Sequence, residues 1–205
     1  MKFRTLLTAV LLLLTANVHA ETFGDTPFGF KMGMSLAEVK ALEGVVVDTM
    51  MEREDRRSKK KILALSSAPV KDDRFGRWEL FFTEKHGLYK FHAISKKTPV
   101  GTGGQGVMPK YVAIREDLTK AYNGYTRSAY VEGVGAWETA GDWLLSVATK
   151  SQRGDGRAFI SHFRPGFYKK SETLEQVEIS LILQDPAVML LIFDFHNSFD
   201  ATYGR

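Results

Sequence analysis

The chain has 205 residues, of which 44% are hydrophobic and 12% aromatic, with a net charge of +4 and no cysteine. This length suits one domain or two small ones, with a core large enough to fold alone. The lack of cysteine excludes disulfides, thiol nucleophiles and thiolate metal sites, and the small net charge argues against a nucleic-acid-binding protein.

The first twenty residues have the pattern of a secretory signal peptide. Lys2 and Arg4 precede an apolar run of 11 residues over 6–16, which is shorter than the about 20 that a membrane-spanning helix needs. We expect cleavage after Ala20 and no integral membrane anchor. The signal carries two basic residues and no acidic ones, so the mature single domain, 21–205, has a net charge of +2. Because no cysteine can carry a lipid, the sequence predicts a soluble periplasmic protein, or one secreted further.

A capping box opens the first predicted helix. Ser35 can cap the helix, and Glu38 can reach back to the cap amide from three positions on. Gly44 is a natural stop for a helix of about two turns. One face of this helix carries the apolar side chains of Leu36, Val39 and Leu42.

The same segment carries a family resemblance. Residues 33–44 read Gly-Met-Ser-Leu-Ala-Glu-Val-Lys-Ala-Leu-Glu-Gly. This pattern resembles the opening helix of the BamE/SmpA outer-membrane assembly domain and is similar to the tandem helix-plus-sheet repeats of the secreted β-lactamase inhibitor protein. The chain departs from the first family in its length and its lack of the lipid-bearing cysteine, and from the second in its lack of disulfides. The resemblance implies a helix packed on an antiparallel sheet in a protein-binding module, and it assigns no functional residue.

Most of the remaining chain shows the period-two pattern of β-strands. The charged stretch 52–61 is interpreted as a solvated loop or as a strand edge blunted with lysine. The last strand is apolar on both faces from Val188 to Phe193, which is typical of a central strand. The predicted strands cover 62–66, 78–83, 88–95, 128–132, 142–149, 157–163, 174–183 and 188–196, with a further short strand around 135–139.

A second helix is predicted between the two groups of strands. It begins near Pro109 and ends at Asn123 and Gly124. Its apolar face carries Tyr111, Ile114, Leu118 and Tyr122.

The predicted fold class is α+β, an antiparallel sheet of meanders and hairpins with two helices packed on it. The repeated order of a helix followed by strands leaves open a tandem duplication, with halves 21–100 and 107–205.

Aromatic residues and arginine in the second half form the candidate partner-binding surface. Trp, Tyr and Arg dominate the energetics of protein interfaces. A strand end that runs into a loop with three aromatic residues over 162–168 is typical of a presented surface. The candidates are Tyr130, Trp137, Arg164, Phe167 and Tyr168.

Histidines and acids provide the candidates for other chemistry. Asp194 and His196 are two apart on one strand and share a face, so they form either an oriented acid/base pair or, with His162, a set of metal ligands. We favour the simpler interpretation, a strand end whose polar groups pair with each other or with solvent. The glycine-rich loop 101–106 lacks the lysine of a P-loop, and no catalytic motif is recognised, so we expect no cofactor and assign no catalytic residue.

These observations favour a non-enzymatic exported protein that binds a periplasmic or envelope protein, as an inhibitor, an immunity protein or an envelope-assembly factor. The first alternative is a carrier of a small ligand or lipid in an apolar pocket between sheet and helices. The second is an enzyme that uses Asp194 and His196.

Overall fold

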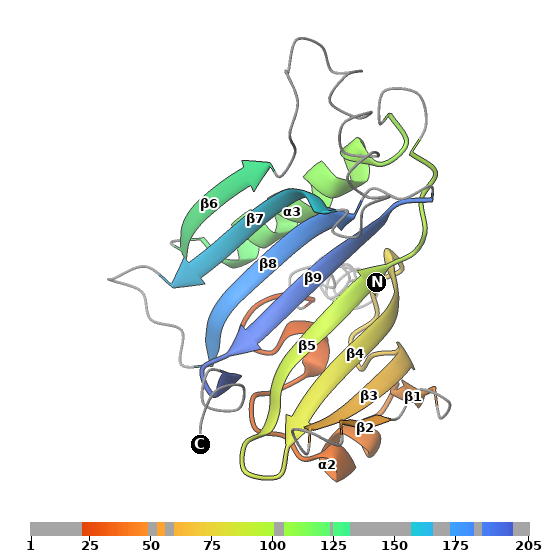
Figure 1. Cartoon of the computed structure of the whole chain (residues 1–205), viewed down its shortest axis with the longest axis vertical. Helices are drawn as coiled ribbons and strands as arrows, with labels where there is room; N and C mark the ends of the chain where they lie inside the picture. Colours follow the sequence, from red (N-terminus) through yellow and green to blue (C-terminus); the bar gives the residue numbers. More distant parts are fainter. Residues whose placement is uncertain are drawn as a thin grey trace, which may run out of the picture.

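The fold is α+β, with one antiparallel sheet and few helices (Figure 1). The structure is a computed structural model, and it describes residues 22–48, 53–55, 60–100, 105–123, 125–131, 157–165, 173–182 and 186–198. The helices in these ranges are the 3₁₀ turn η1 (Pro27–Gly29), α2 (Leu36–Lys40) and α3 (Met108–Ala121). The strands are β1 (Val46–Val47), β2 (Arg53–Asp55), β3 (Lys60–Ser67), β4 (Phe75–Thr83), β5 (Gly87–Ser95), β6 (Tyr125–Val131), β7 (Arg157–Pro165), β8 (Leu174–Ile182) and β9 (Val188–Phe195).

The described strands form a single sheet. Its order is β1-β3-β4-β5-β9-β8-β7-β6, and β2 pairs with β3 as the ninth strand. Every one of these pairings is antiparallel. The strand β9 lies between β5 and β8, so the central position predicted from its apolar sequence is confirmed.

The strand order is arranged about the contact between β5 and β9. The first part of the chain supplies α2 and then strands that end in β5, and the second part supplies α3 and then strands that end in β9. Each part thus places its last strand at the centre of the sheet, where the two central strands pair over Lys90–Ile94 and Leu190–Asp194. This arrangement is compatible with the predicted division into halves.

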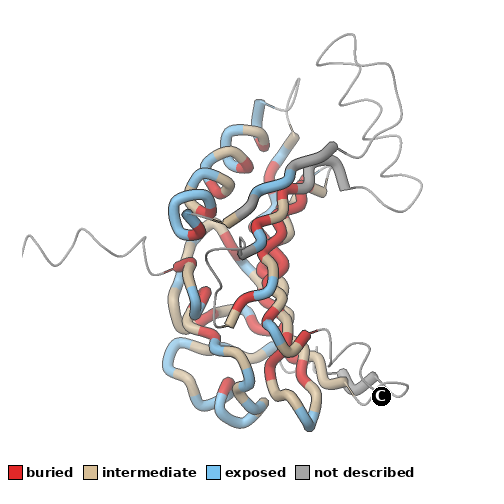
Figure 2. The backbone as a smooth tube through the Cα atoms, turned by 90° about the vertical axis from the view of Figure 1, so that its left-hand side faces the viewer, coloured by how far each residue is buried: buried red, intermediate tan, exposed pale blue. Residues whose placement is uncertain are grey.

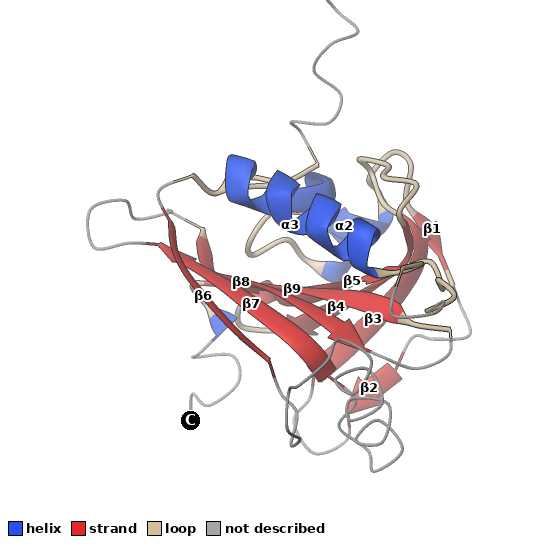
Figure 3. Ribbon diagram, turned by 90° about the horizontal axis from the view of Figure 1, so that it is seen from above, coloured by secondary structure: helices blue, strands red, loops and turns tan. Residues whose placement is uncertain are grey.

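Both helices lie on the same face of the sheet (Figure 3). Buried positions lie along the sheet and on the side of α3 that faces it (Figure 2). The four residues predicted for the apolar face of the second helix are all buried, with at most 3% of each exposed. The first helix and the turn after it behave similarly: Val39 of α2 is fully buried, and Leu36 of α2 and Leu42 of the turn pack against the core.

The capping box is confirmed, although the helix is shorter than expected. Ser35 Oγ accepts a hydrogen bond from the Glu38 amide, and Glu38 Oε2 accepts one from the Ser35 amide at 2.7 Å. The helix ends at Lys40, and Gly44 adopts a φ of +81° in the following turn.

The charged stretch contributes an edge strand, because Arg53–Asp55 pair with β3. The strands predicted over 142–149 and around 135–139 lie outside the described residues. In the part of the chain that the structure describes, no helix is long and apolar enough to cross a membrane.

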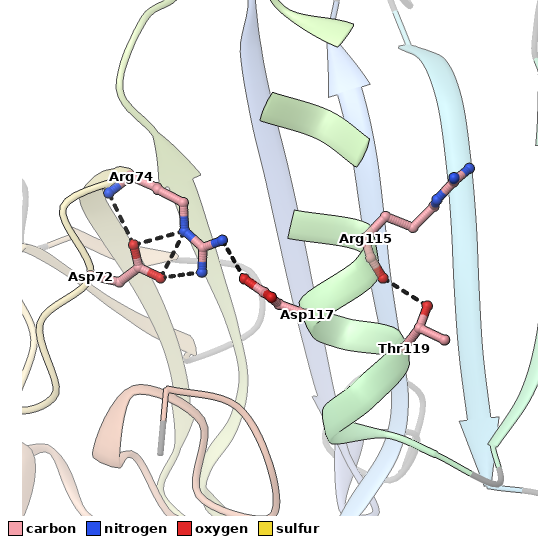
Figure 4. A network of polar contacts seen from close by, with 5 residues as sticks. All are labelled: Asp72, Arg74, Arg115, Asp117 and Thr119. Carbon is pink, nitrogen blue, oxygen red and sulfur yellow. Dashed lines mark hydrogen bonds and ion pairs between the residues drawn. The ribbon is translucent and has the colours of Figure 1, made fainter. Parts of the chain in front are cut away.

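An arginine at the turn between β3 and β4 connects the two parts of the chain (Figure 4). Arg74 binds the Asp72 carboxylate through Nε and Nη2, and its Nη1 contacts Asp117 of α3 at 2.6 Å. Burial alone would lower the pKa of the Arg74 guanidinium, but the hydrogen bonds that it donates to both carboxylates raise the pKa overall. The guanidinium also lies 5.9 Å from the ring centre of Phe23, so it joins the N-terminal segment, the first meander and α3.

Candidate functional site

The sheet has a second face, opposite the helices, which we call the far face. Met189, Leu191, Phe193 and Phe195 of β9 lie in the core, so the alternate residues of this strand lie on the far face. Residues directly opposite each other in a ladder share a face, and the strand registers therefore define the rest of it. Its polar residues on β4, β5, β7, β8 and β9 are Arg77, Glu79, Lys90, His92, His162, Arg164, Gln176, Glu178, Ser180 and Asp194.

A polar network joins β7 and β8 on the far face. Arg164 Nε donates a hydrogen bond to Gln176 Oε1 at 2.8 Å. The other end of the same amide, Gln176 Nε2, lies 3.0 Å from His162 Nδ1. Glu178 Oε2 is 3.7 Å from that ring nitrogen, and Ser180 Oγ donates to Glu178 Oε1 at 2.6 Å. The polar network thus runs from an exposed arginine to a buried serine.

Burial increases steadily along the polar network. Arg164 is exposed, the His162 side chain is 14% exposed, Glu178 is 7% exposed and Ser180 is fully buried. A buried carboxylate is costly without hydrogen-bond donors, and the Ser180 hydroxyl supplies one here. The inner end of the network is therefore held in place, while its outer end reaches solvent.

Asp194 lies on the neighbouring strand and is paired with a lysine. Its Oδ1 is 3.2 Å from Lys90 Nζ, directly across the ladder between β9 and β5. Burial raises the pKa of the Asp194 carboxyl, and nearby Glu175 and Glu178 raise it further, although Lys90 opposes the shift. His196 follows the end of β9 and is exposed, and its amide donates to the Thr173 carbonyl at 2.9 Å.

The residues considered as metal ligands do not lie on adjacent strands. His162 is on β7 and Asp194 is on β9, with Gln176 and Glu178 of β8 between them. Among the described residues, no group of three or more His, Cys, Asp or Glu side chains is arranged to hold a metal ion.

Of the predicted partner-binding residues, Arg164 is described both by its position in β7 and by its side-chain contact with Gln176. Tyr130 belongs to β6 and pairs with Ile160. Trp137, Phe167 and Tyr168 lie outside the described residues. We did not single out Gln176, Glu178 or Ser180, although the alternation of polar and apolar residues over 176–181 was a signal for a polar strip on one face.

The fold and the site together define an α+β protein whose sheet carries a polar network on the face opposite its helices. No protein-family model, curated protein sequence or solved structure matches this chain.

Proposed function

We propose that this chain is an exported periplasmic protein that binds a periplasmic or envelope protein partner through the far face. Inhibition, immunity and envelope assembly are the roles that this proposal includes. The observation that carries it is the position of Arg164. This side chain is exposed, it donates a hydrogen bond to Gln176 at 2.8 Å, and it lies on a sheet face that also bears apolar side chains. The signal-peptide pattern of residues 1–20 supports the export.

The apolar side chains support protein binding because they are only partly covered. Protein interfaces combine an apolar centre with a polar rim, and arginine is enriched among the residues that contribute most of the binding energy. The half-buried apolar residues of the far face are Ile62, Phe81, Ile94, Ile182, Val188 and Leu190. Arg164 lies on β7, which is next to β8 and two strands away from β9, at a position suited to a polar rim.

The interior favours a binding protein over a carrier. Phe28 contacts five other rings between the helices and the sheet, with centroids 5.1–6.3 Å apart. An open depression of about 500 Å³ lies instead between two loops, one after α2 and one after β3. The rings thus fill the part of the interior where a carrier would hold its ligand.

The enzyme alternative, with Asp194 and His196, has less support. The Asp194 carboxylate forms an ion pair with Lys90, and His196 is exposed beyond the end of the strand. A general base needs to be within hydrogen-bond reach of the proton that it removes, in a site that excludes bulk water.

A capture experiment with a matched arginine control tests the proposal. The variant Arg164→Ala removes the exposed cation from the far face. The control Arg127→Ala removes another exposed arginine from the adjacent strand β6. Arg127 pairs with the core residue Phe163 and therefore lies on the opposite face. Cross-linked partners are collected from the periplasm of cells that express each variant.

We expect Arg164→Ala to lower the yield of the cross-linked partner at least several-fold, and Arg127→Ala to leave the yield unchanged. Adding Tyr168→Ala to the first variant extends the test into the predicted loop. Equal loss with both arginine variants, or no loss with Arg164→Ala and Tyr168→Ala together, would contradict binding through the far face. Unfolding temperatures verify that each variant is folded.

A further inference from the structure

The charged side chains of the far face are paired within the chain, except for Arg164. The Arg77 guanidinium contacts the Glu79 carboxylate at 2.6 Å, and the Lys90 ammonium contacts the Asp194 carboxylate at 3.2 Å. In the part of the chain that the structure describes, the side-chain partner of Arg164 is a neutral amide, and no carboxylate lies within ion-pair distance of it. Arg164 is thus the cation that the described far face leaves for a binding partner to neutralise.

The nearest acid on the same face is already engaged elsewhere. Glu178 Oε1 accepts a hydrogen bond from the Ser180 hydroxyl at 2.6 Å, and Glu178 Oε2 lies 3.7 Å from His162 Nδ1. Glu178 is also buried, whereas Arg164 is exposed. A carboxylate that reaches the guanidinium of Arg164 must therefore come from outside the described sheet.

The donors that Arg164 keeps free determine which acceptor fits it. A guanidinium has five N–H donors in a planar fork and binds a carboxylate with two parallel hydrogen bonds, through the edge that contains Nε or through the two terminal nitrogens. Arg164 Nε donates to Gln176 Oε1 at 2.8 Å, so the edge that contains Nε is occupied. Nη1 and Nη2 remain at the exposed tip, where the two oxygens of a carboxylate can meet both of them.

We propose that the partner presents an aspartate or glutamate side chain to Arg164, which binds this carboxylate end-on through Nη1 and Nη2. The inference rests on the proposed function, because it names the chemistry of the partner at the same surface. Gln176 is then a positioning residue, since its hydrogen bond to Nε directs the terminal nitrogens of Arg164 toward solvent.

The strand registers place this acid at the rim of the interface. Leu190 of β9 lies opposite Ser180, and Ser180 lies opposite Ile160 of β7, four residues before Arg164. Strands lie about 4.8 Å apart and residues about 3.4 Å apart along a strand, so the Cα atoms of Leu190 and Arg164 are roughly 16 Å apart. An interface of standard size covers about 800 Å² on each partner, which is enough to include both positions. The partner's acid should accordingly flank the apolar side chains that cover Leu190.

A zero-length cross-link identifies the residue of the partner that contacts Arg164. The variant Arg164→Lys keeps the cation as an amine, which a carbodiimide joins to a touching carboxylate as an amide, with loss of water. The control Arg127→Lys places the same amine on the opposite face, because Arg127 pairs with the core residue Phe163. Each variant is treated with carbodiimide in periplasmic extract, and mass spectrometry identifies the cross-linked peptides.

We expect a cross-link from residue 164 to an aspartate or glutamate side chain of the partner, and none from residue 127 in the control. Charge reversal provides a second measurement. Arg164→Glu should lower the yield of captured partner several-fold below that of Arg164→Ala, because two carboxylates repel each other at the contact. Replacement of the cross-linked acid of the partner by arginine should restore capture by Arg164→Glu.

The outcomes separate this inference from the proposed function. If Arg164→Ala lowers capture, the far face still binds the partner. In that case a missing cross-link at residue 164, a cross-link to the C-terminal carboxylate of the partner, or equal yields with Arg164→Ala and Arg164→Glu would each overturn the acidic side chain. Undiminished capture with Arg164→Ala would overturn both the inference and the far face as the binding surface.

Discussion

Phe28 lies within the aromatic cluster of the interior, where its ring contacts five others. It is fully buried and has a φ of +57°, a left-handed conformation that costs energy for any residue other than glycine. Its ring meets Phe75, Trp78 and Phe193 in edge-to-face contacts with centroids 5.1–6.0 Å apart. Such contacts are favourable for aromatic rings beyond the area that they bury, and they offset the strained backbone.

The change Phe28→Ala should therefore be severely destabilising. We expect the free energy of unfolding to fall by about 3–5 kcal/mol, the range for an aromatic side chain removed from a packed core. Denaturant titration followed by tryptophan fluorescence measures the loss. The matched variant Phe81→Ala removes the same ring from a half-buried position on the far face and should cost less. Equal losses would show that Phe28 has no special place in the core.

Asp194 should make stability depend on pH. Burial is the main cause that raises the pKa of its carboxyl above the unfolded value of 3.8, so the folded protein binds more protons than the unfolded chain just above that pH. Stability therefore falls as pH rises from the unfolded pKa through the folded one. The neutral variant Asp194→Asn removes this dependence.

We expect Asp194→Asn to gain stability relative to the unmodified protein as pH rises from 3.5 to 7. Thermal unfolding at both values measures the change in the difference between the two proteins. The variant Asp73→Asn, which changes an exposed aspartate in the turn before β4, is the control and should show no such trend. A difference that shrinks as pH rises would show that the ion pair with Lys90 outweighs burial.

At the scale of the elements, α2 depends on its cap. The helix has only five residues, and short helices are marginal without support from caps and packing. We expect Ser35→Ala to lower the free energy of unfolding by about 1 kcal/mol, because the Glu38 amide loses its acceptor. Ser35→Asp keeps an acceptor at the cap and should retain most of the stability. Chemical denaturation of the three proteins compares them, and equal stability of Ser35→Ala and the unmodified protein would contradict a role for the cap.

The helices could be predicted from local sequence patterns, whereas the contacts between strands that are far apart in sequence could not. The capping box and the three-and-four spacing of the second helix depend on residues close in sequence, and both are confirmed. The polar network instead requires His162 to lie opposite Glu178, and this register depends on how β7 pairs with β8. Alternation along either strand indicates two faces, but it does not say which residue of one strand lies opposite which residue of the other.

The ends of strands were also difficult to predict from the sequence. We predicted that the strand after the second helix begins at Ser128, whereas β6 begins at Tyr125, directly after Gly124. Tyr122 and Tyr125 pack together with ring centroids 5.1 Å apart, and the Tyr125 amide donates to the Tyr122 carbonyl. This tight connection draws the chain into the sheet three residues earlier than its polar sequence indicates.

At the scale of the whole molecule, the two parts of the chain share one sheet and one core. Phe91 of β5 stacks on Phe193 of β9 with ring centroids 4.5 Å apart and planes at 13°. The Tyr122 hydroxyl, at the end of α3, donates to the Gly24 carbonyl near the start of the described chain, and burial raises the pKa of this phenol. Separation of the two parts of the chain would therefore expose the central apolar strands β5 and β9, and it would break the contact between Tyr122 and Gly24.

The two halves should consequently not fold alone, even if they arose by duplication. We expect fragments 21–100 and 107–205 to lack a cooperative unfolding transition when each is purified separately, because β5 and β9 would become exposed apolar edges. Mixed or co-expressed, the fragments should form a one-to-one complex that regains such a transition, measured by circular dichroism and size-exclusion chromatography. A fragment that unfolds cooperatively on its own would mean that each helix and its meander are an independent domain. In that case the contact between β5 and β9 would be an interface between domains, and the far face would consist of two separable surfaces.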